Sequence, residues 1–191
     1  MLRTLDDNVN MLFQLSDGEA DVLQDWAENR LPLAASGSPI APLDVSGLPV
    51  SGRQGQIDRA GVLADYLRIF VGKWNEDLSP DGELSWRAVA DRTGSYLGLL
   101  FETEERNEAG SQSTENDGEA QGDLRAALTN LSRTLDVDET HNIVNRGIVR
   151  IVGDTYMAII KPSEKRLWSK SAAREDYEAT LVQAMNLAPT G

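Results

Sequence analysis

Residues 143–187 read IVNRGIVRIVGDTYMAIIKPSEKRLWSKSAAREDYEATLVQAMNL, the most informative stretch of the chain. It opens with two apolar runs on either side of Gly153-Asp154, which predicts a hairpin of two strands. A basic connector that carries Trp168 comes next. The stretch closes with an amphipathic helix that is expected to start at Ser169 or Ser171. The inward face of this helix is expected to hold Tyr177, Leu181 and Met185.

The same stretch reverses the charge of the molecule. Between Arg146 and Arg174 there are seven basic residues and two acidic ones, a net charge of +5, whereas the whole chain carries −13. Such segregation predicts a docking surface. The residues expected to bind a partner are Lys161, Lys165, Arg166, Trp168, Lys170 and Arg174, together with Trp26 near the N-terminus. The alternative is that Trp168 anchors the connector to the core while its basic neighbours pair with the chain's own acids.

A second helix–hairpin pattern lies upstream. A helix from about Asp58 to Leu78 has a continuous apolar face that includes Trp74, and two strand-like runs follow it, ELSWRAVA and SYLGLLFE. The glycine between these runs, Gly94, can supply a positive φ for the hairpin loop. A leucine-rich helix after Asp123 begins the second unit. The order α-β-β-α-β-β-α over residues 58–187 predicts an α+β domain with a four-stranded antiparallel sheet and helices on one face.

The N-terminal part reads as an attachment to this domain. Residues 1–31 predict a helical extension in which Ser16 and Glu19 form a capping box. The apolar stripe of its second helix comprises Val22, Leu23, Trp26 and Ala27. Residues 32–57 are rich in Pro, Gly and Ser, which predicts a linker that lies extended along a surface. The helices are therefore tethered, and they could pack on the main body or on another molecule.

Residues 102–123 are expected to form a mobile acidic loop. They hold eight acidic residues, one basic residue and no large apolar residue. Nothing in such a segment offsets the entropy lost when a chain is ordered. The loop would interrupt the domain between its two helix–hairpin units.

The composition narrows the classes of protein. The 191 residues include no cysteine, which excludes disulfides, thiolate metal sites and cysteine nucleophiles. Neither a signal peptide nor an apolar stretch long enough to span a bilayer is present, so a cytoplasmic protein with no membrane contact is expected. The net charge of −13 disfavours general binding to nucleic acid and suits docking to a basic partner.

No residue pattern predicts catalysis, a cofactor or a metal. His141 lies close to Asp136, Asp138 and Glu139. However, this segment lacks the spacing of a calcium loop, and a solvated loop explains it better. Residues 47–54 superficially resemble a phosphate-binding loop, but Arg53 and Gln54 stand where lysine and a hydroxyl residue are needed. The sequence contains no G-x-S-x-G motif. We therefore expect that the protein is not an enzyme and that it has no cofactor or metal.

Two resemblances complete the reading. The segment from Tyr156 to Ala173 resembles the ending of uncharacterised bacterial accessory proteins encoded near restriction, methylation or anti-phage modules. This likeness implies a small non-catalytic subunit beside a larger nucleic-acid enzyme. The order of elements, with its low isoelectric point, is also similar to secretion chaperones of α+β fold, which are acidic dimers that wrap extended client segments. The chain departs from that pattern, because its first unit has two strands rather than three and an N-terminal extension is added.

The sequence thus predicts a non-catalytic interaction protein, an accessory subunit that docks a larger protein partner. One alternative is an acidic, chaperone-like homodimer that holds a client segment. Another is nucleic-acid binding, either through the basic face of residues 146–174 or by way of a partner.

Overall fold

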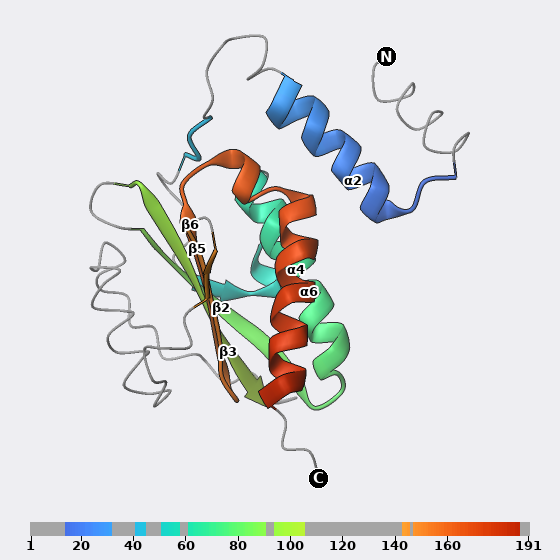
Figure 1. The fold of residues 1–191 in the computed structure, drawn as a ribbon. Coiled ribbons are helices and arrows are strands. Elements are labelled where there is room, and N and C mark those ends of the chain that lie inside the picture. The colour runs from blue at the N-terminus through green and yellow to red at the C-terminus, as the bar shows by residue number, and fades with distance from the viewer. Residues whose placement is uncertain are drawn as a thin grey trace.

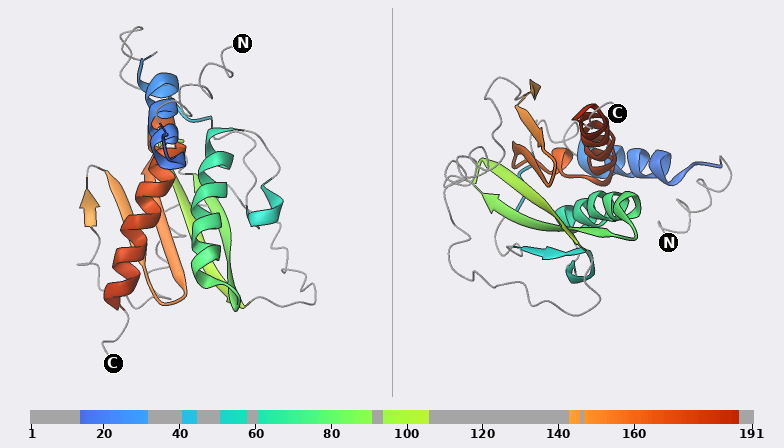
Figure 2. Two further views of the ribbon diagram at one scale, coloured as in Figure 1. Left: turned by 90° about the vertical axis from the view of Figure 1, so that its right-hand side faces the viewer. Right: turned by 90° about the horizontal axis from the view of Figure 1, so that it is seen from below.

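The computed structural model describes residues 14–31, 41–44, 51–57, 61–90, 94–105, 143–145 and 147–187. These residues form an α+β structure with a six-stranded antiparallel sheet in the order β1-β2-β3-β6-β5-β4. Two long helices, α4 and α6, lie side by side on one face of the sheet (Figure 1). A shorter helix, α2, lies across the beginning of α6 (Figure 2).

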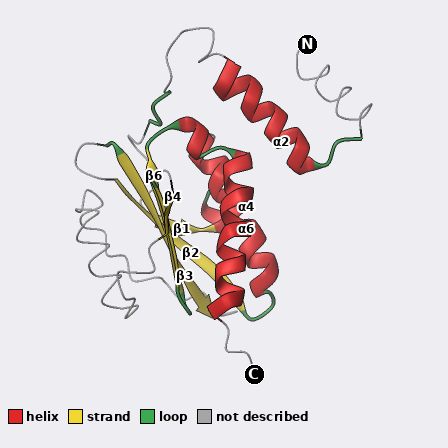
Figure 3. Cartoon of the chain, in the orientation of Figure 1, coloured by secondary structure: helices red, strands yellow, loops and turns green. Residues whose placement is uncertain are grey.

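The bounds of the elements follow the chain. The helices are α2 (Asp17–Asp25), which continues as a π turn, η1 (Trp26–Arg30), then α4 (Val62–Leu78) and α6 (Lys170–Leu187). The strands are β1 (Ser51–Arg53), β2 (Gly82–Ala90), β3 (Tyr96–Glu105), β4 (Ile143–Asn145), β5 (Ile148–Val152) and β6 (Tyr156–Pro162). Two 3₁₀ turns, η2 (Gln54–Gln56) and η4 (Lys165–Leu167), complete the described elements; Figure 3 separates helices from strands.

The prediction of an α+β fold with an antiparallel sheet is confirmed, but the number of strands is wrong. The first apolar run of the second hairpin is divided at Gly147, whose φ of 80° suits a tight turn, into β4 and β5. Residues 51–53, expected to be linker, pair with β2 as the edge strand β1. The sheet therefore has six strands instead of four.

Strand β3 is longer than its sequence suggests. Its pairing with β2 runs from Ala90↔Leu97 to Gly82↔Glu105, so residues 102–105 belong to the strand and not to an acidic loop. Backbone pairing and the ion pair of Glu104 with Arg53 hold these polar residues in place. The hairpin loop contains Gly94 with a φ of 68°, as the sequence predicted.

The core lies between the sheet and the two long helices. Alternate residues of β2, β3 and β6 face α4 and α6, including Trp86, Phe101 and Ile159. Helix α4 supplies the matching apolar face, and the indole of its buried Trp74 donates to Oγ1 of Thr180 on α6 at 3.2 Å. A smaller apolar cluster lies on the other face of the sheet, made of Val89, Leu100, Ala158 and Ile160.

Helix α6 begins where the sequence predicted, and two of the three residues expected on its inward face, Tyr177 and Leu181, are partly buried and pack against the core. The carbonyl of Ser169 accepts the first helical hydrogen bond, from the N–H of Ala173 at 3.0 Å. Met185, expected to face inward, is 69 % exposed. The fully buried positions are Ala173, Asp176 and Thr180, which recur at intervals of three and four residues. Two polar side chains therefore occupy the inward stripe, and periodicity of apolar residues alone does not find them.

The described part of the predicted linker lies extended on the domain. Within residues 41–44, the N–H of Leu43 donates to the carbonyl of Ser163 at 2.8 Å, and Pro42 forms a β-bridge with Glu164. Leu43 is buried. This contact anchors the chain to the connector between β6 and α6.

Several predictions fall outside the described residues. They concern the first N-terminal helix, Asp58 as the cap of α4, the acidic loop beyond Glu105, the helix after Asp123, and the acidic segment at His141. Helix α4 begins at Val62 with Gly61 as its N-cap residue. Among the helices that the structure describes, none has the length and hydrophobicity required to cross a bilayer.

Candidate functional site

Two residues of the predicted basic surface lie inside the protein. Trp168 is 0 % exposed and Lys161 is 1 % exposed. The Trp168 indole donates to the carbonyl of Pro162 at 3.0 Å and packs edge-on against the Tyr66 ring at 5.1 Å. Trp168 therefore anchors the connector to the core, as the alternative interpretation of the sequence held, and it cannot stack on a nucleic-acid base.

Lys161 belongs to a buried cluster centred on Asp176. The Asp176 carboxylate accepts from Tyr66 Oη at 2.5 Å, from Arg150 Nη2 at 2.6 Å and Nε at 2.9 Å, and from Lys161 Nζ. Lys161 Nζ also donates to the carbonyl of Leu167 at 2.8 Å. The Asp176 carboxylate thus joins α4, β5 and β6 to α6, and Lys161 links the cluster to the connector.

Burial shifts the ionisation of this cluster. It lowers the pKa of the Lys161 amine below its ordinary value, although the neighbouring Asp176 carboxylate opposes the effect. Burial, with the nearby Asp176 carboxylate, raises the pKa of the Tyr66 phenol well above its usual range. Shifted groups of this kind often mark catalytic sites. Here Tyr66, Lys161 and Asp176 are closed off from solvent, so a substrate does not reach them in this structure.

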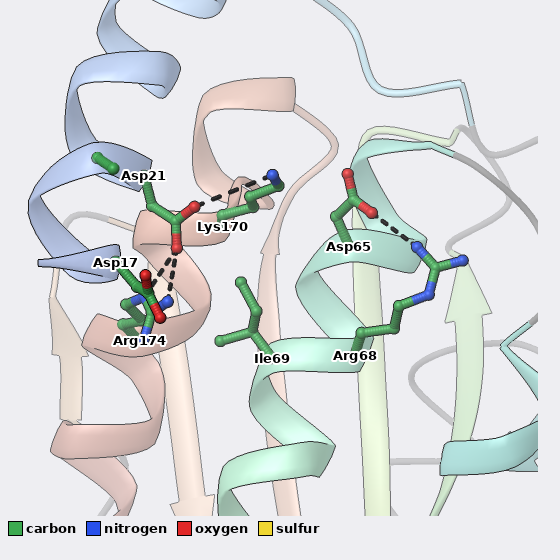
Figure 4. Close-up of a pocket in the computed structure, with 8 residues that line it drawn as sticks. Asp17, Asp21, Asp65, Arg68, Ile69, Lys170 and Arg174 are labelled. Atoms are coloured by element: carbon green, nitrogen blue, oxygen red, sulfur yellow. Dashed lines mark hydrogen bonds and ion pairs between the residues drawn. The ribbon is translucent and has the colours of Figure 1, made fainter. Parts of the chain in front are cut away.

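A second group of charges joins α2 to the start of α6. The Asp21 carboxylate accepts from Arg174 Nε at 2.9 Å and Nη2 at 2.8 Å, and lies 3.9 Å from Lys170 Nζ (Figure 4). The Asp25 carboxylate accepts from the backbone N–H of Ser171 at 2.8 Å and from its hydroxyl. It therefore satisfies one of the free N–H groups that every helix N-terminus leaves.

An open cleft of about 350 Å³ adjoins this contact, between α2, α4 and α6. Its lining comprises Asp17, Ala20, Asp21, Asp65, Arg68, Ile69, Lys170 and Arg174. The cations already face carboxylates, since Arg68 pairs with Asp65 at 2.7 Å and Arg174 with Asp21. The balanced charge of this cleft does not select an anionic or a cationic ligand.

Helix α2 turns its apolar stripe away from the protein. Of the predicted stripe, Val22, Leu23 and Trp26 are 54 %, 51 % and 51 % exposed, and Ala27 is exposed as well. Leu31, just after the π turn, is 44 % exposed and extends the apolar surface, and no residue of α2 is buried. Its acidic face, Asp17, Asp21 and Asp25 at intervals of four residues, lies on the opposite side, towards α6. The predicted capping box of Ser16 and Glu19 is present.

The remaining predicted residues lie at the surface. Lys165 and Arg166 are exposed, and Arg166 Nε pairs with Glu164 at 2.7 Å. The structure therefore brings Lys170 and Arg174 together with α2, places Lys161 and Trp168 in the core, and leaves Lys165, Arg166 and Trp26 accessible. Four cations of the 146–174 segment share two carboxylates that lie outside it: Arg150 and Lys161 face Asp176, and Lys170 and Arg174 face Asp21.

Sequence reasoning missed the acidic partners of these cations. Asp176 could have been noticed as a charged residue on the inward stripe of α6, three positions after Ala173. The spacing of Asp21 and Asp25 is a visible signal of an acidic helical face. Nothing local indicates which cation each carboxylate meets.

The described residues contain no group of three or more His, Asp or Glu side chains that could hold a metal ion. In comparisons with known proteins, no family model, curated protein or solved structure matches the chain. The two resemblances drawn from the sequence therefore stay predictions.

Proposed function

We propose that this protein is a non-catalytic interaction protein, an accessory subunit that docks a protein partner through the exposed stripe of Val22, Leu23, Trp26 and Leu31. The observation that carries the proposal is the orientation of α2. Its acidic face is bound to α6 and its apolar stripe faces outward.

This orientation is the reverse of the usual one. An amphipathic helix on a globular protein ordinarily buries its apolar stripe against the core and leaves its charges in water. Large apolar side chains grouped on one helix face are the anchors of helix-in-groove recognition, and Trp26 is of the residue type that dominates binding energy at interfaces. An outward stripe of this kind supports a role in docking.

The other functions are less well supported. Direct nucleic-acid binding needs free cations, whereas Lys161, Arg150 and Arg174 are paired with the chain's own carboxylates. Catalysis by the Asp176 cluster needs access that the cluster lacks. A chaperone-like homodimer has no specific observation in its favour.

The test is affinity purification of tagged protein from cells that express it, with quantitative mass spectrometry. Substituting Leu23→Ser together with Trp26→Ser should reduce capture of the partner by about thirtyfold or more, since interface tryptophans each contribute about 2 kcal/mol or more. The matched control, Val182→Ser with Met185→Ser, changes an apolar pair at the far end of α6 that is at least as exposed, and it should leave capture unchanged. The proposal is contradicted if both double variants lose capture of the partner to the same extent, or if neither of them loses it.

A further inference from the structure

We infer that presentation of the apolar stripe is regulated by an electrostatic latch, the contact of Asp21 and Asp25 with Lys170, Ser171 and Arg174. Closing the latch holds the segment as a helix with its stripe outward; opening it by salt or by charge reversal releases the segment. The inference rests on the proposed function for its biological consequence, while the latch itself is measured without a partner.

The beginning of α6 calls for external negative charge. A helix N-terminus carries the positive end of the helix dipole and prefers acidic neighbours. The first turn of α6 contains no acidic residue and instead has Lys170, followed by Arg174 one turn later. Asp21 and Asp25 supply the missing carboxylates from a segment about 150 positions earlier in the chain.

The contacts that hold α2 are weak individually and sensitive to salt. No residue of α2 is buried, so little apolar area resists its release. The Asp21–Arg174 pair is partly exposed, with side chains 14 % and 26 % exposed; such pairs contribute about 1 kcal/mol each, and added salt weakens them. A helix of nine residues, even with the five of the π turn, is marginal on its own in water. Helix formation in this segment is therefore coupled to docking on α6.

Hydrogen–deuterium exchange of the full chain tests the latch. At about 0.05 M salt, Arg174→Glu should speed exchange of the α2 amides by about tenfold, because it replaces two hydrogen bonds to Asp21 by repulsion. Raising salt to about 1 M should have the same effect on the wild type. Lys165 is exposed and lies outside the latch. The substitution Lys165→Glu makes the same change of charge and should leave the exchange rates of the α2 amides as in the wild type. Amides of α4 report whether each variant keeps its fold.

If Arg174→Glu also loosens α4, the milder Asp21→Asn provides the same comparison from the other side of the contact. Exchange in α2 that is indifferent to salt and to both substitutions overturns the inference. The proposed function is tested separately by partner capture. It is contradicted if the double variant Leu23→Ser with Trp26→Ser captures the same proteins as the wild type, whatever the exchange rates of the α2 amides. If that variant loses capture but the exchange of the α2 amides does not respond to salt, the latch is refuted and the proposed function stands.

Discussion

At Asp176, one buried carboxylate faces two cations and a phenol. Asp176→Ala should lower the free energy of unfolding by about 3–5 kcal/mol, because Lys161, which is 1 % exposed, would be left inside the protein without its counter-charge. Asp21→Ala, which removes a partly exposed ion pair between α2 and α6, should cost less, about 1 kcal/mol. Urea denaturation measures both. Similar small losses in the two variants would show that the cluster is not the organising contact of the core.

Tyr177 provides a prediction about alkaline pH. Its hydroxyl donates to Oδ2 of Asp77 at 2.6 Å, which raises the pKa of Tyr177 to about 12, against an ordinary value of 10.0. Between these values the unfolded chain loses this proton and the folded protein keeps it. This interaction therefore stabilises the fold fully below pH 10, and its contribution is lost as pH rises towards 12.

Tyr177→Phe removes that part of the pH dependence. Between pH 10 and 12, the free energy of unfolding of the variant should fall less steeply with pH than that of the wild type. The difference in slope should correspond to at most one proton bound by the folded and not by the unfolded chain. Urea titrations at a series of pH values give the two slopes. Parallel slopes would mean that the phenol titrates alike in the folded and unfolded chains.

At the scale of elements, the edge strand β1 depends on a close approach of backbone to side chain. A Cβ at Gly52 would lie 3.1 Å from the ring of Trp86, which is 2 % exposed and has little room to move. Gly52→Ala should therefore cost about 1–3 kcal/mol of stability through overpacking. The control is Gly55→Ala, because a Cβ at Gly55 meets nothing within 4 Å. Equal thermal midpoints for the two variants would contradict this account of β1.

The sequence revealed those elements whose signals are local. Strand-like apolar runs predicted β2 and β6, the apolar face that includes Trp74 predicted α4, and the capping box marked the start of α2. Strand β1 lacked such a signal, since its three residues lie in a segment rich in proline and glycine and become a strand only by pairing with β2.

The candidate site was harder to predict, because its contacts join distant parts of the chain. Lys161 occupies an inward position of a strand whose other inward residues are apolar, and its burial follows from a carboxylate on α6. Trp26 was predicted to lie on a stripe, but the side it faces depends on the pairing of Asp21 with Arg174. Composition showed the excess of positive charge without showing that the chain supplies its own anions.

At the scale of the whole molecule, charge decides between the candidate partners. The chain carries −13 overall, and the described basic residues of the +5 segment largely meet internal carboxylates. We expect no shift of labelled DNA or RNA by the wild type at about 0.15 M salt, since phosphate contacts need free cations. A shift that weakens steeply with added salt would restore the nucleic-acid interpretation.

The central claim is that α2 offers its apolar stripe to another protein. A photo-crosslinking amino acid placed at Trp26 tests it directly, because the reagent reports which surface lies beside that side chain. Irradiation of cells that express the variant should give adducts heavier than the protein itself, with the partner identified by mass spectrometry. Adducts of twice the mass of the chain would place a second copy on the stripe in place of a different protein. Crosslinks confined to the protein's own body would contradict the account, because the stripe would then face inward.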